Sequence, residues 1–93
     1  MTNPLTLKNP IDLAIFYNKR GVEEYKLGEY QKSIEYFYIA IELNPKYAEA
    51  YHNRGFTNKA LKQDEKAQED FGEAKELKNK NLISGISLRN LPI

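Results

Sequence analysis

Hydrophobic residues recur along the chain at the spacing of amphipathic helices. Between residues 30 and 43, Ile34, Phe37, Tyr38 and Ile41 follow one another at intervals of three, one and three residues, so they fall on one face of an α-helix. Comparable stripes precede and follow this segment, and no alternating β pattern competes with them between residues 10 and 78. The pattern predicts four helices, over residues 10–27, 30–43, 47–61 and 64–78.

Punctuating residues stand at the expected ends of these helices. Asn9 is suited to cap the first helix, and Pro10 is tolerated at its first position because the missing N–H has no helical partner there. Gly28 suits the position just beyond a helix end. Asn44 precedes Pro45, which pushes it out of the helical region and ends the second helix.

The chain contains an internal repeat of 34 residues. Residues 14–47 align with residues 48–81 without a gap, and eleven of the 34 pairs are identical, against about two expected from average residue usage. Each unit has a glycine inside a helix, where glycine costs about 1 kcal/mol relative to alanine. Each glycine is followed after twelve residues by a small residue, which predicts a close approach of two antiparallel helices beside an aromatic ring. These positions are Gly21, Ser33 and Phe37 in the first unit and Gly55, Ala67 and Phe71 in the second.

The repeat resembles the tetratricopeptide repeat family, whose unit is a 34-residue helix–turn–helix. The resemblance covers 68 of the 93 residues and weakens in the second unit, where Lys62 replaces the turn glycine Gly28 and Asn79 replaces Pro45. The matching residues are Tyr17, Gly21, Tyr25, Ser33, Phe37, Ala40 and Pro45, then Tyr51, Gly55, Ala67, Phe71 and Ala74.

The resemblance implies an all-α fold, a helical repeat or α-solenoid of four antiparallel helices with a C-terminal tail or short capping helix. We expect residues 1–93 to form a single domain. Its parts are an N-terminal extension over 1–13, repeat one over 14–47, repeat two over 48–81 and a tail over 82–93.

Membership of this family further implies a concave groove lined by the first helix of each unit, which binds a peptide or an extended segment of a partner protein. Asn18, Asn53 and His52 are expected to hydrogen-bond the partner's backbone. The lysines outnumber the glutamate, which favours an acidic partner. The expected groove residues are Asn18, Lys19, Val22, Tyr25, Lys26, Glu49, His52, Asn53, Phe56 and Lys59, with Ile15 beside them.

The ends of the stack suggest an alternative function, self-assembly. The start of the first helix is apolar almost all round, although no preceding repeat covers it. The tail is too apolar for a simple linker and too interrupted for a long helix, so we expect it either to dock on the groove or on a second copy, or to form a short cap near residues 80–86. A homodimer would use Leu13, Ile15, Phe16, Leu88 and Leu91.

Composition narrows the function classes further. The net charge of +1 gives no general attraction to nucleic acid or to an anionic membrane. The chain has no cysteine and one histidine, His52, which leaves no cysteine nucleophile and no two-histidine metal motif. No apolar run spans a bilayer or resembles a signal peptide. We therefore expect a non-catalytic cytoplasmic adaptor without cofactor or metal. A small nucleic-acid-binding or catalytic subunit is the rival from another class.

Overall fold

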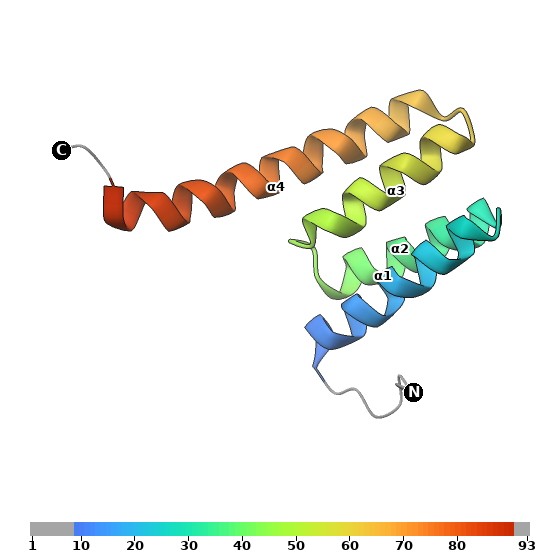
Figure 1. The fold of residues 1–93 in the computed structure, drawn as a ribbon, viewed down its shortest axis with the longest axis horizontal. Coiled ribbons are helices and arrows are strands. Elements are labelled where there is room, and N and C mark those ends of the chain that lie inside the picture. The colour runs from blue at the N-terminus through green and yellow to red at the C-terminus, as the bar shows by residue number, and fades with distance from the viewer. Residues whose placement is uncertain (1–8, 91–93) are drawn as a thin grey trace.

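The computed structural model describes residues 9–90, with side chains described through residue 80. All regular structure in residues 9–90 is α-helical, which confirms the predicted fold class. Successive helices run in opposite directions, with α1 packed on α2, α2 on α3 and α3 on α4 (Figure 1). The helices are α1 (Pro10–Lys26), α2 (Tyr30–Leu43), α3 (Ala48–Ala60) and α4 (Asp64–Asn90).

The first repeat is bounded by the residues that the sequence indicated. The Oδ1 atom of Asn9 accepts a hydrogen bond from the backbone N–H of Ile11 at 2.8 Å, and Pro10 occupies the first helical position. Gly28 ends the turn after α1 with φ at +80°, in the left-handed region that glycine enters without a steric penalty. Both the N-cap and the turn glycine are confirmed.

The turn of the second repeat has the same shape without the glycine. Lys62, at the position equivalent to Gly28, has φ at 61°, where its Cβ approaches its own backbone. A non-glycine residue in this region costs roughly 1–2 kcal/mol. The second turn is therefore held by packing of the helices on either side of it rather than by its own preference.

The predicted close approach of helices at the two glycines is confirmed. A Cβ atom added at Gly21 would lie 2.6 Å from Cδ1 of Phe37, and one added at Gly55 would lie 2.6 Å from Cε1 of Phe71. Ser33 donates a hydrogen bond from its hydroxyl to the Gly21 carbonyl oxygen at 2.8 Å. Each repeat thus packs an aromatic ring directly against bare backbone, at distances that no other residue permits without movement.

The two repeats share one small core. Phe37 is 1% exposed and Thr57 is fully buried, and the Thr57 hydroxyl lies 3.3 Å from that of Ser33 across the joint between α2 and α3. A core of this size in a chain of 93 residues leaves little stability to spare. The central cluster consists of Ala14, Ala40, Ile41 and Ala50, bordered by Tyr17, Leu43, Tyr47 and Tyr51.

The fourth helix is longer than the sequence predicted. It was expected to end near residue 78, before a separate tail, but α4 continues as one helix to Asn90. Residues 82–90 therefore neither form a distinct cap nor fold back over the groove, and the last turns of α4 extend beyond the other helices (Figure 1). The interruption at Gly85 costs only about 1 kcal/mol in a helix, and proline is absent until Pro92. Residues 91–93 lie outside the described part of the chain.

None of the helices in the described part of the chain has an apolar stretch of the length needed to cross a membrane.

Candidate functional site

The first helices of the two repeats form a depression at the place where the sequence predicted a groove. Its volume is about 360 Å³, which lies within the range of ligand-binding clefts. Three of its lining residues belong to α1 and two to α3, so the depression exists only because the repeats stack. It is lined by Val22, Tyr25, Lys26, Asn53 and Phe56, all of which belong to the predicted groove.

Two aromatic side chains give this depression its apolar character. Tyr25 is 37% exposed and Phe56 is 48% exposed, which is unusual for rings that could contribute to a core. Each ring has an aromatic neighbour beneath it: the centroid of Tyr25 lies 5.4 Å from that of Tyr30, and the centroid of Phe56 lies 5.3 Å from that of Phe71. Each ring thus packs against a second aromatic ring while part of its surface remains exposed to solvent.

The floor of the depression is polar. Asn53 donates a hydrogen bond from Nδ2 to Oδ1 of Asn18 at 3.0 Å. Asn18 is only 4% exposed and lies beneath the groove surface, so it orients Asn53 and does not itself reach a ligand. Thr57 donates to the backbone carbonyl of Asn53 at 3.0 Å. Asn53 itself lines the depression, and its Oδ1 atom takes part in neither of these bonds.

His52 lies next to this depression rather than in it. Its ring is 4.9 Å from that of Phe56 and 5.4 Å from that of Phe71, both in edge-on arrangements. It lines a second depression of about 260 Å³ between α3 and α4, together with Phe71, Ala74, Lys75, Lys78 and Asn79. In the described residues, no group of three or more histidine, aspartate and glutamate side chains is placed to share a metal ion.

The remaining predicted groove residues are charged and exposed. Lys19, Glu49 and Lys59 do not line the depression, whereas Lys26 does. Burial raises the pKa of the nearby Tyr47 hydroxyl, and the charge of Glu49 raises it further. The charged side chains at the predicted groove positions are thus three lysines and one glutamate, all of them exposed.

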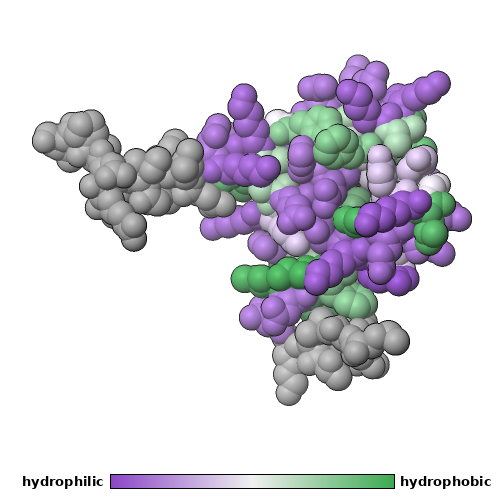
Figure 2. Space-filling view, in the orientation of Figure 1, coloured by the Kyte–Doolittle hydropathy of each residue, from purple (hydrophilic) through white to green (hydrophobic). Residues whose placement is uncertain are grey.

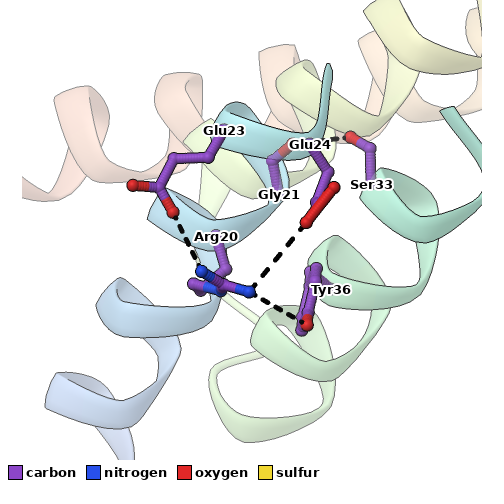
Figure 3. Close-up of polar contacts among 6 residues, drawn as sticks. All are labelled: Arg20, Gly21, Glu23, Glu24, Ser33 and Tyr36. Atoms are coloured by element: carbon purple, nitrogen blue, oxygen red, sulfur yellow. Dashed lines mark hydrogen bonds and ion pairs between the residues drawn. The ribbon is translucent and has the colours of Figure 1, made fainter. Parts of the chain in front are cut away.

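A polar cluster in the first repeat was not anticipated from the sequence. Arg20 lies 3.4 Å from the hydroxyl of Tyr36, 3.4 Å from Oε1 of Glu23 and 3.9 Å from Oε1 of Glu24 (Figure 3). The guanidinium also lies 5.3 Å from the centre of the Tyr36 ring. The hydrogen bond to Tyr36 is the main cause of the raised pKa of Arg20.

The equivalent arginine of the second repeat has a different and tighter set of partners. Arg54 binds both carboxylate oxygens of Asp70, at 2.9 and 2.8 Å, and Asn58 donates to the same carboxylate at 3.0 Å. The hydrogen bond to Asp70 raises the pKa of Arg54. These three residues line a third depression, of about 320 Å³, but they satisfy one another there. The identity of Arg20 and Arg54 in the repeat alignment was the only signal in the sequence for these clusters.

The residues predicted for self-association are only partly described. Ile15 is 39% exposed, and Leu13 and Phe16 are half-buried at the open side of α1. Leu88 belongs to α4, but its side chain lies outside the described residues, as does the whole of Leu91. On the face in Figure 2, apolar side chains form separate patches among polar ones. Among the residues whose side chains the structure describes, the large apolar ones with substantial exposure are Ile11, Ile15, Tyr25, Leu27, Tyr38, Ile39 and Phe56.

Comparison with known proteins agrees with this geometry. Residues 14–47 match one model of the tetratricopeptide repeat and residues 36–69 match another. An uncharacterized protein of Methanocaldococcus jannaschii is 43% identical over 61 residues, which cover 66% of this chain and 71% of that protein. The chain therefore belongs to the tetratricopeptide repeat family. Repeats of this family act in general as protein–protein interaction modules, and the fold is generally non-catalytic.

Proposed function

We propose that this chain is an adaptor that binds an extended segment of a partner protein in the groove between α1 and α3. The observation that carries the proposal is the depression lined by Val22, Tyr25, Lys26, Asn53 and Phe56. It combines exposed aromatic rings with one oriented polar group and one cation, all presented by helices whose packing fixes their spacing.

Each part of the groove suits one feature of an extended segment. Tyr25 and Phe56 form apolar walls for a large side chain, and burying such a side chain contributes about 1.5–3 kcal/mol. Asn53 offers Oδ1 to a backbone N–H, which an extended segment leaves without an internal partner. Because Asn18 already holds the Asn53 amide, the ligand need not order it.

Charge favours a segment with acidic residues beside the apolar anchor. Lys26 lines the depression, and Lys19 and Lys59 are exposed on the same two helices, against Glu49 alone. Exposed charges contribute more to the rate and selectivity of association than to its strength. We therefore expect binding to weaken as salt concentration rises.

The proposal can be tested with a library of displayed 12-residue peptides selected against the immobilised full chain. We expect enriched peptides to carry one large apolar residue next to aspartate or glutamate. The affinity of a labelled selected peptide is then measured by fluorescence anisotropy. The triple variant Lys19→Glu/Lys26→Glu/Lys59→Glu should weaken it at least about tenfold, through loss of the apposed charges.

Two further variants separate the groove from the rest of the surface. Asn53→Ala should weaken the same peptide, whereas Tyr38→Ala, which removes an exposed ring on α2, should leave its affinity unchanged. No enrichment in the selection, or equal affinity for the wild type and the triple variant, would contradict a groove-based function.

A further inference from the structure

The two repeats have the same fold, but the same face of the helix pair has a different environment in repeat one and in repeat two. In repeat one the face formed by α1 and α2 is covered by α3, so that Phe37 is 1% exposed, Ala40 is fully buried and Ile41 is 8% exposed. Ala50 of α3, itself fully buried, lies in the same cluster as Ala40 and Ile41. This face of a repeat therefore packs against the first helix of a following repeat.

The corresponding face of repeat two has no such cover in the described part of the chain. Shifting by 34 residues maps Phe37, Ile41 and Asn44 onto Phe71, Lys75 and Lys78. Phe71 is partly exposed, and Lys75 and Lys78 are exposed. These residues surround the depression of about 260 Å³ beside His52, which we term the end face. Because α4 continues straight to Asn90, the next helical turns of the chain do not cover it (Figure 1).

Helix α1 is the first helix of its repeat, as α3 is, and one of its sides is only partly covered. By the same shift, α1 corresponds to α3, so that Leu13 and Phe16 stand where Tyr47 and Ala50 stand in the joint between the repeats. Leu13 and Phe16 are only half-buried, and Asp12 beside them is exposed. We term these three residues the start face.

Size and charge are complementary between the two faces. Ala50 fills the joint inside the chain, whereas the larger Phe16 ring would enter the 260 Å³ depression of the end face, next to the Lys75 stem. In the exposed loop between α2 and α3, Lys46 and Asn44 are close neighbours, and the backbone N–H of Lys46 donates to Oδ1 of Asn44 at 3.2 Å. The equivalent pair between two copies is Asp12 and Lys78, which carry opposite charges.

We propose that copies of this chain associate head to tail, with the start face of one copy on the end face of the next. The joint repeats the packing of α3 on α2, and the residues of its two faces are not those that line the depression of the peptide groove. One pair of residues weakens the joint between copies. Ala67 and Glu23 stand at the positions equivalent to Ser33 and Thr57, so a carboxylate lies near an apolar methyl group where the internal joint has two hydroxyls in contact. Association is therefore reversible and depends on concentration.

The solution mass of the full chain tests this proposal. Sedimentation equilibrium from about 10 µM to about 1 mM should give a mass that rises past twice that of the monomer, because a head-to-tail joint leaves one open face at each end. A monomer throughout this range would overturn the proposal.

Two variants that each disable one face distinguish the geometry. Phe16→Glu alters the start face, and Lys75→Glu/Lys78→Glu reverses the charge of the end face at two exposed positions. Each variant alone should associate at least tenfold more weakly than the wild type. An equimolar mixture should form a dimer and nothing larger, since it contains one unaltered start face and one unaltered end face.

Controls keep these results independent of folding and of the groove. Lys32→Glu, an exposed change on α2, should associate as the wild type does, and far-UV circular dichroism should show intact helices in every variant. If Phe16→Glu unfolds, Phe16→Ala replaces it as the start variant. A selected groove peptide should still bind the variants, so loss of peptide binding and loss of association are separate outcomes. Unaltered association of the end variant, or a monomeric mixture, would overturn head-to-tail packing.

Discussion

The two repeats share eleven identical positions and the same pair of helices, yet they differ in what stabilises them. Repeat one has Gly28 in its turn and a loose cluster around Arg20, and its aromatic ring is covered on both sides. Repeat two has Lys62 in a left-handed turn, a bidentate pair between Arg54 and Asp70, and a partly exposed ring. The shared residues specify how two helices pack within a repeat. The differing residues reflect the place of each repeat in the stack.

The largest difference is expected at the aromatic rings. Phe37→Ala should lower the free energy of unfolding by about 4 kcal/mol, because a fully buried ring leaves a cavity when it is truncated. Phe71→Ala should cost about 2 kcal/mol, since part of that ring already faces solvent. Urea denaturation followed by circular dichroism at low protein concentration measures both values. Equal losses would mean that the ring of repeat two is covered as well as that of repeat one.

The ion pairs should give the next largest contrast. Asp70→Asn removes the charge that Arg54 and Asn58 share, and we expect a loss of about 2 kcal/mol because Asp70 is nearly buried. Glu24→Gln should cost under about 0.5 kcal/mol, since its contact with Arg20 is long and the arginine side chain is 43% exposed. The same denaturation experiment compares them. A cost at Glu24 that matched the cost at Asp70 would show that the first cluster is as tight as the second.

The turns should respond in opposite directions. Lys62→Gly should raise the free energy of unfolding by about 1 kcal/mol, because glycine relieves the left-handed strain at the expense of some chain entropy. Gly28→Ala should lower it by about 1 kcal/mol for the converse reason, since φ there is +80°. Thermal melting of both variants next to the wild type is sufficient. Destabilisation by Lys62→Gly would indicate that the Lys62 side chain has a packing role.

The smallest effect concerns alkaline pH. Burial raises the pKa of the Tyr47 and Tyr51 hydroxyls, so the phenolate is less favourable in the folded chain than in the unfolded one. Their contribution to stability is complete below the unfolded pKa of about 10 and declines as the pH rises above it. Denaturation between about pH 8 and about pH 11 should show this decline. It should be shallower in Tyr47→Phe/Tyr51→Phe, and an identical decline in that variant would assign it to other groups.

The sequence was sufficient for the parts of the fold that rest on local rules and on the repeat. The packing of Gly21 against Phe37 followed from residue spacing, and the turn at Gly28 followed from residue type. The length of α4 did not, because the interrupted pattern of the tail predicts the end of the helix, whereas a single glycine such as Gly85 costs only about 1 kcal/mol within a helix. The acidic partners of the two arginines were also not predicted, because they do not occupy equivalent positions. Asp70, the partner of Arg54, lies on the second helix of repeat two, whereas the partners of Arg20 lie on the first helix of repeat one.

The groove shows the same limit. The resemblance to the tetratricopeptide repeat assigned Val22, Tyr25 and Phe56 to the faces that form the depression. It could not distinguish Asn18 from Asn53, since both are polar residues at groove positions. Their hydrogen bond settles the difference: Asn18 is buried and orients, and Asn53 is presented. Which of two neighbouring amides reaches the surface depends on the crossing of α1 and α3, which no local pattern encodes.

A map of backbone amide chemical shifts of the ¹⁵N-labelled chain, recorded on addition of a selected peptide, tests directly whether the groove is the binding site. We expect the largest changes around Val22, Lys26 and Phe56 on α1 and α3, with little change around Tyr38 and Ile39 on α2. Saturable changes confined to the surface of α2 or α4, with α1 and α3 unaffected, would contradict the assignment of the groove as the binding site.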